Sequence, residues 1–505
     1  PNTLPSSTML LALPSSASLV TTTPAAIRPV LRPRAQLLAT RTALGPADLV
    51  SEPTSTASGS AAFSWEANWY PVMPTSYADP VRPNGFTLLG KHLVLWKSAD
   101  GWACVEDACP HRLAPLSTGR VTEEGTLMCR FHGWRFDDAG NCVEVPNADA
   151  GSAASLCGAP ETCATSYPVQ EVSGLLWVWP EAGLEGLGRS LLEEPAALGS
   201  GAQDWVMTVP PVSYESMVEN SMDPSHAPHL HEGTFAASDM VPLTDYSAPA
   251  EPLGDEGFTV AHGGYTTKND GMKATRTFRS PSFVDVNYEL PSGKQQNFQL
   301  FFVPSTPFET RVITGLGLPQ LPAWLPKREL LADLLHAFFF SRSALWRFND
   351  QDRLVMQGQD RNQAADPDRR QAAWDVATPS DTGVSTFRKW LAEVGGGGPF
   401  ASSGAAASLP TTQEEVSRWN VHGKHCPSCR RALALLEGTQ AALGKMALFA
   451  AVAAAALAVA GRLASGIVAT AAAVALSAGS RWAVGGRAAF FGMERELWLP
   501  QVYAR

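Results

Sequence analysis

Two cysteines and two histidines form a tight pattern in CPHRLAPLSTGRVTEEGTLMCRFHGW, residues 109–134. Cys109 and His111 make one pair, 17 residues follow, and Cys129 and His132 make a second pair. Proline and glycine next to these residues favour tight turns, so each pair is expected on its own short loop. This arrangement of sulfur and imidazole ligands constrains the chain more than any other feature.

The pattern is typical of a [2Fe–2S] cluster with mixed ligation, in which Cys109 and Cys129 bind one iron and His111 and His132 bind the other. Structural zinc uses the same atoms, but zinc fingers usually place a Cys-x2–4-Cys pair before a His-x3–5-His pair. The alternating order therefore indicates a Rieske cluster. Because such a cluster only passes electrons, a second site must receive them.

The stretch ENSMDPSHAPHLHEGTF, residues 219–235, supplies candidates for that second site. Asn220, Asp223 and His226 are spaced to share one helical face, and a proline separates them from His231. His226 and His231 can thus occupy neighbouring positions on one metal ion. Asp223 and Asn220 are predicted as catalytic residues beside it, with Asp223 accepting a hydrogen bond from His226. His229 is expected behind the ligands or at the substrate. A histidine-rich surface turn is the alternative.

A third ligand is expected from FNDQDRLVMQGQD, residues 348–360, within a predicted helical run from 328 to 359. One carboxylate would complete a 2-His-1-carboxylate triad, which leaves positions open on non-haem Fe(II) for O₂. Asp350, Asp352 and Asp360 are the candidates. The ordinary alternative is a run of charges on a solvated helix face.

The predicted fold class is α+β, with short strands from 63 to 180 and mixed strands and helices from 204 to 394. Residues 1–46 contain arginine among Ser, Thr, Ala and Pro but no Asp or Glu, which predicts a transit peptide; a disordered tail is the alternative. The net charge of −10 argues against nucleic acid as a partner. The segments are 1–50, transit peptide; 63–180, Rieske domain; 204–394, catalytic domain; 395–412, linker; 413–442, Cys-x2-Cys segment; 443–481, helical hairpin; 482–505, tail.

Cys426 and Cys429 stand at Cys-x2-Cys spacing within HGKHCPSC. They could form a redox-active dithiol. The two cysteines together with His422 and His425 are equally consistent with a four-ligand zinc site.

Two stretches without charged side chains, 446–461 and 463–480, follow the cysteines. A tight glycine-arginine connection between them predicts two antiparallel helices. Basic residues outside the hairpin loop predict a membrane hairpin whose ends stay on one side of the bilayer. Because the stretches are rich in alanine, a soluble helical hairpin is the alternative.

Together, FSWEANWYPV, CPHRLAPLS, CRFHGW, ENSMDPSH and HCPSC resemble the pheophorbide a oxygenase family of plastid Rieske monooxygenases. That family includes chlorophyllide a oxygenase and Rieske proteins of the chloroplast import translocon. The resemblance implies a Rieske β-domain, a helix-grip catalytic domain with an antiparallel sheet, and a C-terminal membrane anchor. It places the carboxylate ligand at Asp352, because Gln359 follows seven residues later.

The resemblance further implies a chlorophyll-derived tetrapyrrole as substrate and ferredoxin as electron donor. It implies a [2Fe–2S] cluster and a mononuclear non-haem Fe(II) as cofactors, and a location at the thylakoid or inner envelope of the chloroplast. A thioredoxin-sensitive dithiol at Cys426 and Cys429 is also implied. So is a homotrimer in which Asp223 bonds a cluster histidine of the neighbouring subunit. The alternative function is a redox-sensing component of the import machinery that performs no oxygenation.

Overall fold

The computed structural model describes residues 63–491, except for 197–203, 232–239, 244, 250–251, 268–269, 317–323, 343, 367–377 and 402–416. The predicted transit peptide, most of the predicted linker and the last residues of the predicted tail lie outside the described residues.

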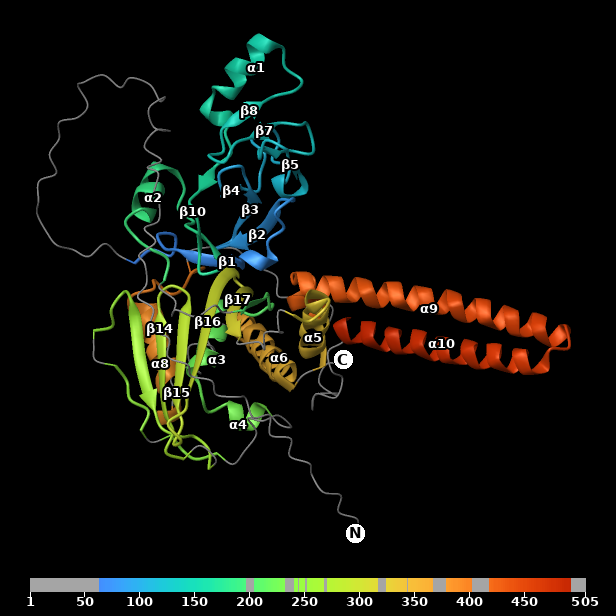
Figure 1. Ribbon diagram of the computed structural model, residues 1–505. Helices are drawn as coiled ribbons and strands as arrows, with labels where there is room; N and C mark the ends of the chain where they lie inside the picture. Colours follow the sequence, from blue (N-terminus) through green and yellow to red (C-terminus); the bar gives the residue numbers. More distant parts are fainter. Residues whose placement is uncertain are drawn as a thin grey trace, which may run out of the picture. The chain divides into compact units, whose positions relative to one another are not determined.

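The N-terminal domain consists of short antiparallel strands (Figure 1). Three sheets have the strand orders β1-β11-β10, β2-β3-β4-β9 and β5-β6-β7-β8. The strands are β1 (Tyr70–Pro74), β2 (Asn84–Leu88), β3 (Lys91–Lys97), β4 (Trp102–Glu106), β5 (Arg120–Val121), β6 (Leu127–Met128), β7 (Arg135–Phe136), β8 (Cys142–Glu144), β9 (Ser166–Tyr167), β10 (Val169–Val172) and β11 (Leu175–Val178). Two short helices accompany them, α1 (Ala150–Cys157) and α2 (Gly183–Ser190).

The catalytic domain is built on one six-stranded antiparallel sheet of order β12-β17-β16-β15-β14-β13. Its strands alternate inward apolar and outward polar side chains, as a sheet with one covered face requires. They are β12 (Asp204–Thr208), β13 (Gly257–His262), β14 (Lys273–Arg279), β15 (Phe283–Glu289), β16 (Gln295–Thr306) and β17 (Glu309–Leu316).

Helices α3 (Tyr214–Met222) and α8 (Thr382–Glu393) pack against this sheet and enclose an aromatic core. The ring of Phe278 on β14 lies 5.2 Å from Phe387 and 4.9 Å from Trp390, both on α8. The remaining helices of the domain are α4 (Ala227–Leu230), α5 (Arg328–Arg342) and α6 (Ala344–Ala365). An antiparallel sheet covered by helices matches the predicted α+β class. Helices α3 and α6 are in contact.

The predicted helical run of residues 328–359 is helical, but it consists of two helices, α5 and α6. The start of the predicted linker is packed against the catalytic domain rather than free of it. The Gly395 N–H donates to the Trp390 carbonyl of α8 at 2.9 Å, and the Gly395 carbonyl accepts a hydrogen bond of 2.9 Å from the indole of Trp65.

A long antiparallel helical pair, α9 (Pro427–Val459) and α10 (Leu463–Phe491), forms the C-terminal part (Figure 1). Helix α9 runs unbroken from the second cysteine motif into the hairpin, so the predicted boundary at 443 lies inside it. At about 1.5 Å per residue, 33 and 29 residues exceed the ~30 Å thickness of a bilayer core. Both helices are long and apolar enough to span a membrane.

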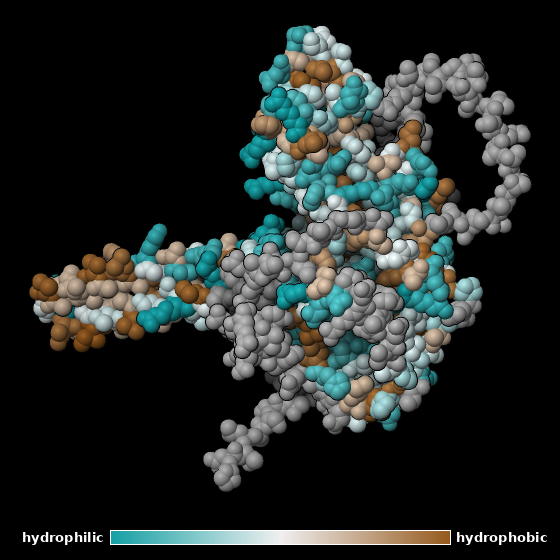
Figure 2. All heavy atoms as spheres, turned by 180° about the vertical axis from the view of Figure 1, so that it is seen from behind, coloured by the Kyte–Doolittle hydropathy of each residue, from teal (hydrophilic) through white to brown (hydrophobic). Residues whose placement is uncertain are grey.

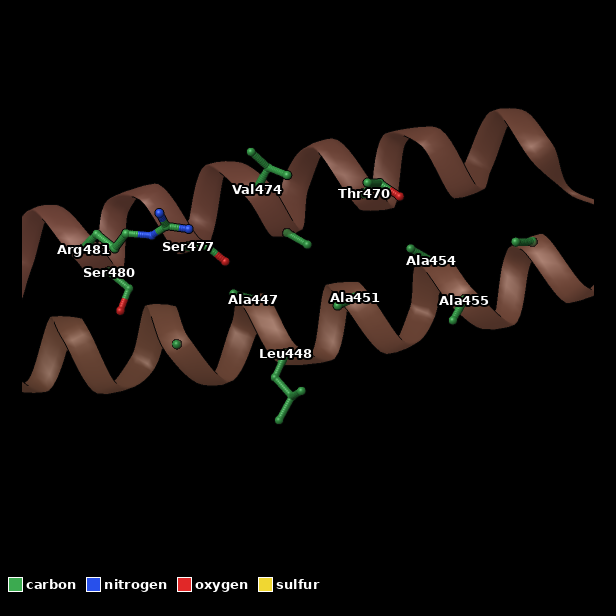
Figure 3. A pocket seen from close by; sticks show the side chains of 13 residues that line it. Ala447, Leu448, Ala451, Ala454, Ala455, Thr470, Val474, Ser477, Ser480 and Arg481 are labelled. Atoms are coloured by element: carbon green, nitrogen blue, oxygen red, sulfur yellow. The ribbon is translucent and has the colours of Figure 1, made fainter.

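The surface of the hairpin is apolar over much of its length, as Figure 2 shows. Leu448, Phe449 and Val459 on α9 are among its exposed large hydrophobic residues. Between the helices the side chains are small. The groove in Figure 3 is lined mostly by alanine, serine and threonine, including Ala447, Ala451 and Ser477, which allow the backbones to approach closely.

Candidate metal centres

Cys109 and Cys129 stand on two loops with the same backbone pattern. In each loop the cysteine N–H donates to the carbonyl five residues later, at 2.9 Å for Cys109 and 2.8 Å for Cys129. The residue four positions after each cysteine donates back to the cysteine carbonyl, and it has a positive φ: 58° at Leu113 and 77° at Gly133. Both sulfurs are buried. The matched pairs seen in the sequence thus correspond to matched turns.

The two histidines of these loops lie side by side. The rings of His111 and His132 are 4.7 Å apart, and His111 stacks on Trp134 at 4.8 Å and 4°. The buried Nδ1 of His111 has no hydrogen-bond partner among the described residues. A buried acceptor held in place beside a second imidazole fits a nitrogen ligand of a [2Fe–2S] cluster. Exposed Leu113 and Phe131 flank this edge.

A second centre joins the turn after α3 to α6. Oδ1 of Asp352 lies 3.5 Å from Nε2 of His226 and 3.4 Å from Nε2 of His231. This Oδ1 is buried and has no hydrogen-bond partner among the described residues. One ligand atom from each side chain lies within 4.8 Å of the others. Three donors converging on one point fit a 2-His-1-carboxylate iron site.

Neighbouring side chains fix the His231 ring. Phe348 stacks on it at 3.4 Å, and Gln351 places Oε1 3.3 Å from its Nδ1. Both neighbours stand on α6, as Asp352 does. An amide oxygen on Nδ1 selects the tautomer that leaves Nε2 for a metal. One helix therefore carries the carboxylate and orients a histidine.

The other two aspartates of the segment have structural partners. Asp350 is fully buried between Arg353 at 2.6 Å and Arg418 at 2.8 Å. Asp360 accepts hydrogen bonds from Ser213 at the start of α3. All three aspartates are buried, so the alternative of a solvated charged face is wrong. Of the three, Asp352 alone belongs to the metal-type cluster.

The prediction that Asn220, Asp223 and His226 share one helical face is wrong, because α3 ends at Met222 and Asp223 is extended. Oδ2 of Asp223 nevertheless lies 3.5 Å from Nδ1 of His226. Its other oxygen accepts from the N–H and hydroxyl of Ser225, so this aspartate shapes the turn rather than the start of a helix. Asn220 hydrogen-bonds to Asp352.

His229 lies outside the metal-type cluster. Its Nε2 is 3.1 Å from the sulfur of Met240, and its side chain is exposed. The geometry therefore gives no reason to count it among the ligands.

Burial shapes the titration of this centre. It raises the pKa of Asp352 to about 7, against the opposing effects of His226 and Asn220. It lowers the pKa of His231 to about 4. Burial also lowers the pKa of His226, but the Asp223 hydrogen bond and the Asp352 charge outweigh it and raise that pKa overall. A divalent cation would stabilise the ionised carboxylate that burial disfavours.

Sequence reasoning missed a buried arginine behind the centre. Arg276 on β14 donates to the Ser221 carbonyl, to Nε2 of His262 at 3.0 Å and to the Tyr288 hydroxyl at 2.8 Å. It supports the turn that carries Asp223. The available signal was the alternation of KATRTFR, which places Arg276 on the inward face between Ala274 and Phe278.

Comparison with known proteins defines the class of this chain. Residues 68–168 match the Rieske [2Fe-2S] domain family, and residues 211–395 match the vanillate O-demethylase oxygenase C-terminal domain family. The two matches cover the two metal centres. The chain is therefore a Rieske-type oxygenase with a [2Fe–2S] cluster.

Similarity to individual proteins identifies the family. The chain is 29% identical over 412 residues to pheophorbide a oxygenase of Oryza sativa subsp. japonica, covering 75% of each chain. It is 30% identical over 414 residues to the Arabidopsis thaliana protein of that name, covering 73% of each. Protein TIC 55 of Pisum sativum is 28% identical over 362 residues, covering 69% of this chain and 61% of the relative. This chain belongs to the pheophorbide a oxygenase family, which confirms the resemblance. These relatives are all named chloroplastic, as predicted.

Proposed function

We propose that the protein is a chloroplast monooxygenase that oxidises a chlorophyll-related tetrapyrrole with O₂ and electrons from ferredoxin. The observation that carries the oxygenase chemistry is the convergence of His226, His231 and Asp352 around one point. The substrate class rests on the relatives named pheophorbide a oxygenase. The α9–α10 hairpin supports a membrane-anchored enzyme, which suits a flat apolar substrate.

In this proposal Cys109, Cys129, His111 and His132 hold the cluster, and His226, His231 and Asp352 hold the iron. A mononuclear Fe(II) with three protein ligands supplies open positions where O₂ is activated. Side chains around the three ligands hold them in orientation. Phe348 and Gln351 fix His231, Asn220 fixes Asp352, and Asp223 holds Nδ1 of His226.

Asp223 is also the proposed electron bridge between subunits of a homotrimer. It touches His226 on one side and is partly exposed, which leaves room for a cluster histidine of a neighbouring chain. Asp223→Asn should keep both iron centres but lose most turnover. Near-normal turnover in that variant, or full activity of a monomer measured by light scattering, would contradict the bridge.

The decisive test uses the purified full-length protein with reduced ferredoxin, O₂ and a panel of tetrapyrroles that includes pheophorbide a and chlorophyllide a. Mass spectrometry should find a product that carries oxygen from ¹⁸O₂. The matched control is His226→Ala, which should retain the Rieske absorption and make no product. A product of equal yield from this control would overturn the ligand assignment.

The second candidate is a redox-sensing component of the import machinery, favoured by the match to Protein TIC 55. In that case the cluster would be reduced by ferredoxin, but no substrate of the panel would gain oxygen. The cysteine pair Cys426 and Cys429 would then respond to thioredoxin.

A further inference from the structure

A cluster of four metal-type donors lies outside both iron centres, at the base of the hairpin. It consists of His336 on α5, His422 in the π-helix Trp419–Gly423, Cys426 at the N-cap of α9 and Cys429 in the first turn of α9. One ligand atom from each lies within 4.8 Å of the others. His422 and both cysteines are buried, with 2% or less of each exposed.

Two distances within this cluster are close to those around a single tetrahedral ion. Nε2 of His336 is 3.4 Å from Nε2 of His422 and 3.2 Å from Sγ of Cys426. Zinc bonds of about 2.0–2.3 Å place neighbouring ligand atoms of a tetrahedron about 3.3–3.8 Å apart. His336 thus already stands at close to the separation from His422 and Cys426 that one ion requires, and Cys429 lies within 4.8 Å of all three.

The orientation of His422 also supports a metal site. Its Nδ1 lies 2.9 Å from the carbonyl oxygen of Met207 on β12. Because a carbonyl only accepts, Nδ1 carries the proton, and Nε2 presents its lone pair to the cluster. A backbone carbonyl behind a histidine ligand is one of the usual outer contacts of protein metal sites.

The fourth ligand is not the one that the sequence offered. His425 stands within the cysteine motif, but its Nε2 lies 3.2 Å from the Asn420 carbonyl. His336, which is 86 residues before His422, takes the place instead. The group contains two thiols and two imidazoles from three separate elements.

We propose that His336, His422, Cys426 and Cys429 bind a structural Zn²⁺ ion. Two thiolates and two neutral imidazoles complete a closed tetrahedral shell, which leaves no position for a substrate. The ion fastens α9, and thus the hairpin, to α5 and to β12. The neighbouring pair Arg431–Asp333, at 2.6 Å, joins α9 to α5 at the same place.

A chain of contacts connects the proposed zinc site to the iron centre. The π-helix is preceded by Arg418, which pairs at 2.8 Å with Asp350. Asp350 is two residues before Asp352 on α6. Loss of the zinc should therefore loosen α6 as well as the hairpin, although no zinc ligand touches the iron site.

The test measures metals in the full-length protein purified in detergent without added chelator. Plasma mass spectrometry should find one zinc per chain in addition to iron. X-ray absorption at the zinc edge should show two sulfur and two nitrogen neighbours. His336→Ala and Cys429→Ser should lower zinc at least tenfold, whereas the matched control His425→Ala should keep it.

A chain with less than 0.1 zinc and a Cys426–Cys429 disulfide or free dithiol would overturn the proposal in favour of a redox pair. So would zinc that persists in His336→Ala and vanishes in His425→Ala. Because a variant could fail to fold, the wild-type zinc count and its sulfur-nitrogen shell decide the question independently of any substitution.

Discussion

Two regions of this molecule contain the same four donors, two cysteines and two histidines, yet they are built differently. In the Rieske loops each cysteine and its histidine are two or three residues apart on matched turns. In the C-terminal cluster the donors come from α5, the π-helix and α9. The C-terminal donors lie within 4.8 Å of one another, and among the described residues the Rieske donors do not form such a group.

The difference teaches that donor type alone does not select a metal group. A [2Fe–2S] cluster separates its two irons, so each needs its own pair of ligands, and the two loops supply them. A single zinc ion needs four ligands around one point, so distant elements can contribute. Spacing in the chain identifies the first arrangement, and spacing in the fold identifies the second.

Reciprocal substitutions should separate the two regions most sharply. Cys129→Ser should abolish the EPR signal of the reduced cluster and leave zinc at one per chain. Cys429→Ser should do the reverse, because the sites have no ligand in common. EPR and metal analysis of both variants check this. Loss of both metals in either variant would show that the regions are coupled rather than independent.

The iron centre extends the comparison to a site without sulfur. Asp352→Ala should lower bound mononuclear iron and turnover by more than about 100-fold, because a ligand is lost. Asp350→Asn is the matched control on the same helix. It should keep the iron but reduce the free energy of unfolding by about 3–5 kcal/mol, since Arg353 and Arg418 lose a buried partner. The opposite pattern would exchange the roles of the two aspartates.

One type of substitution should have different effects in the two regions. His132→Cys adds a charged thiolate to the cluster and should lower its reduction potential by on the order of 100 mV or more. His422→Cys should leave zinc bound, because zinc accepts three cysteines and one histidine. Protein-film voltammetry and zinc analysis are the measurements. An unchanged potential in His132→Cys would argue against His132 as a ligand.

The smallest expected effect is the dependence of Fe(II) binding on pH. With the pKa of Asp352 raised to about 7, lowering the pH from 8 to 6 should weaken Fe(II) binding to metal-free protein about tenfold, because binding requires the ionised carboxylate. The same raised pKa gives the stability of metal-free protein the opposite pH dependence, because the contribution of Asp352 to the free energy of unfolding is fully present below the ordinary carboxylate pKa. It is lost as pH rises through about 7. Titration of Fe(II) at both pH values checks this, and equal affinities would contradict it.

Sequence alone determined the features whose partners are close along the chain. The Rieske pairs, the His226–His231 segment and the two apolar helices are local patterns, because turns, short loops and helices are set by neighbouring residues. Family resemblance added Asp352, whose Oδ1 lies 3.5 Å from His226 and 3.4 Å from His231.

Only the tertiary structure decided which distant side chains meet. The sequence of α6 does not reveal that Asp350 neutralises Arg418 while Asp352 faces two histidines, because a helix turn of 100° per residue separates their directions. The sequence places His425 next to the cysteines, but its Nε2 lies 3.2 Å from the backbone carbonyl of Asn420. Packing of α5 against α9 brings His336 into that position instead, and such packing depends on the whole core rather than on any local pattern.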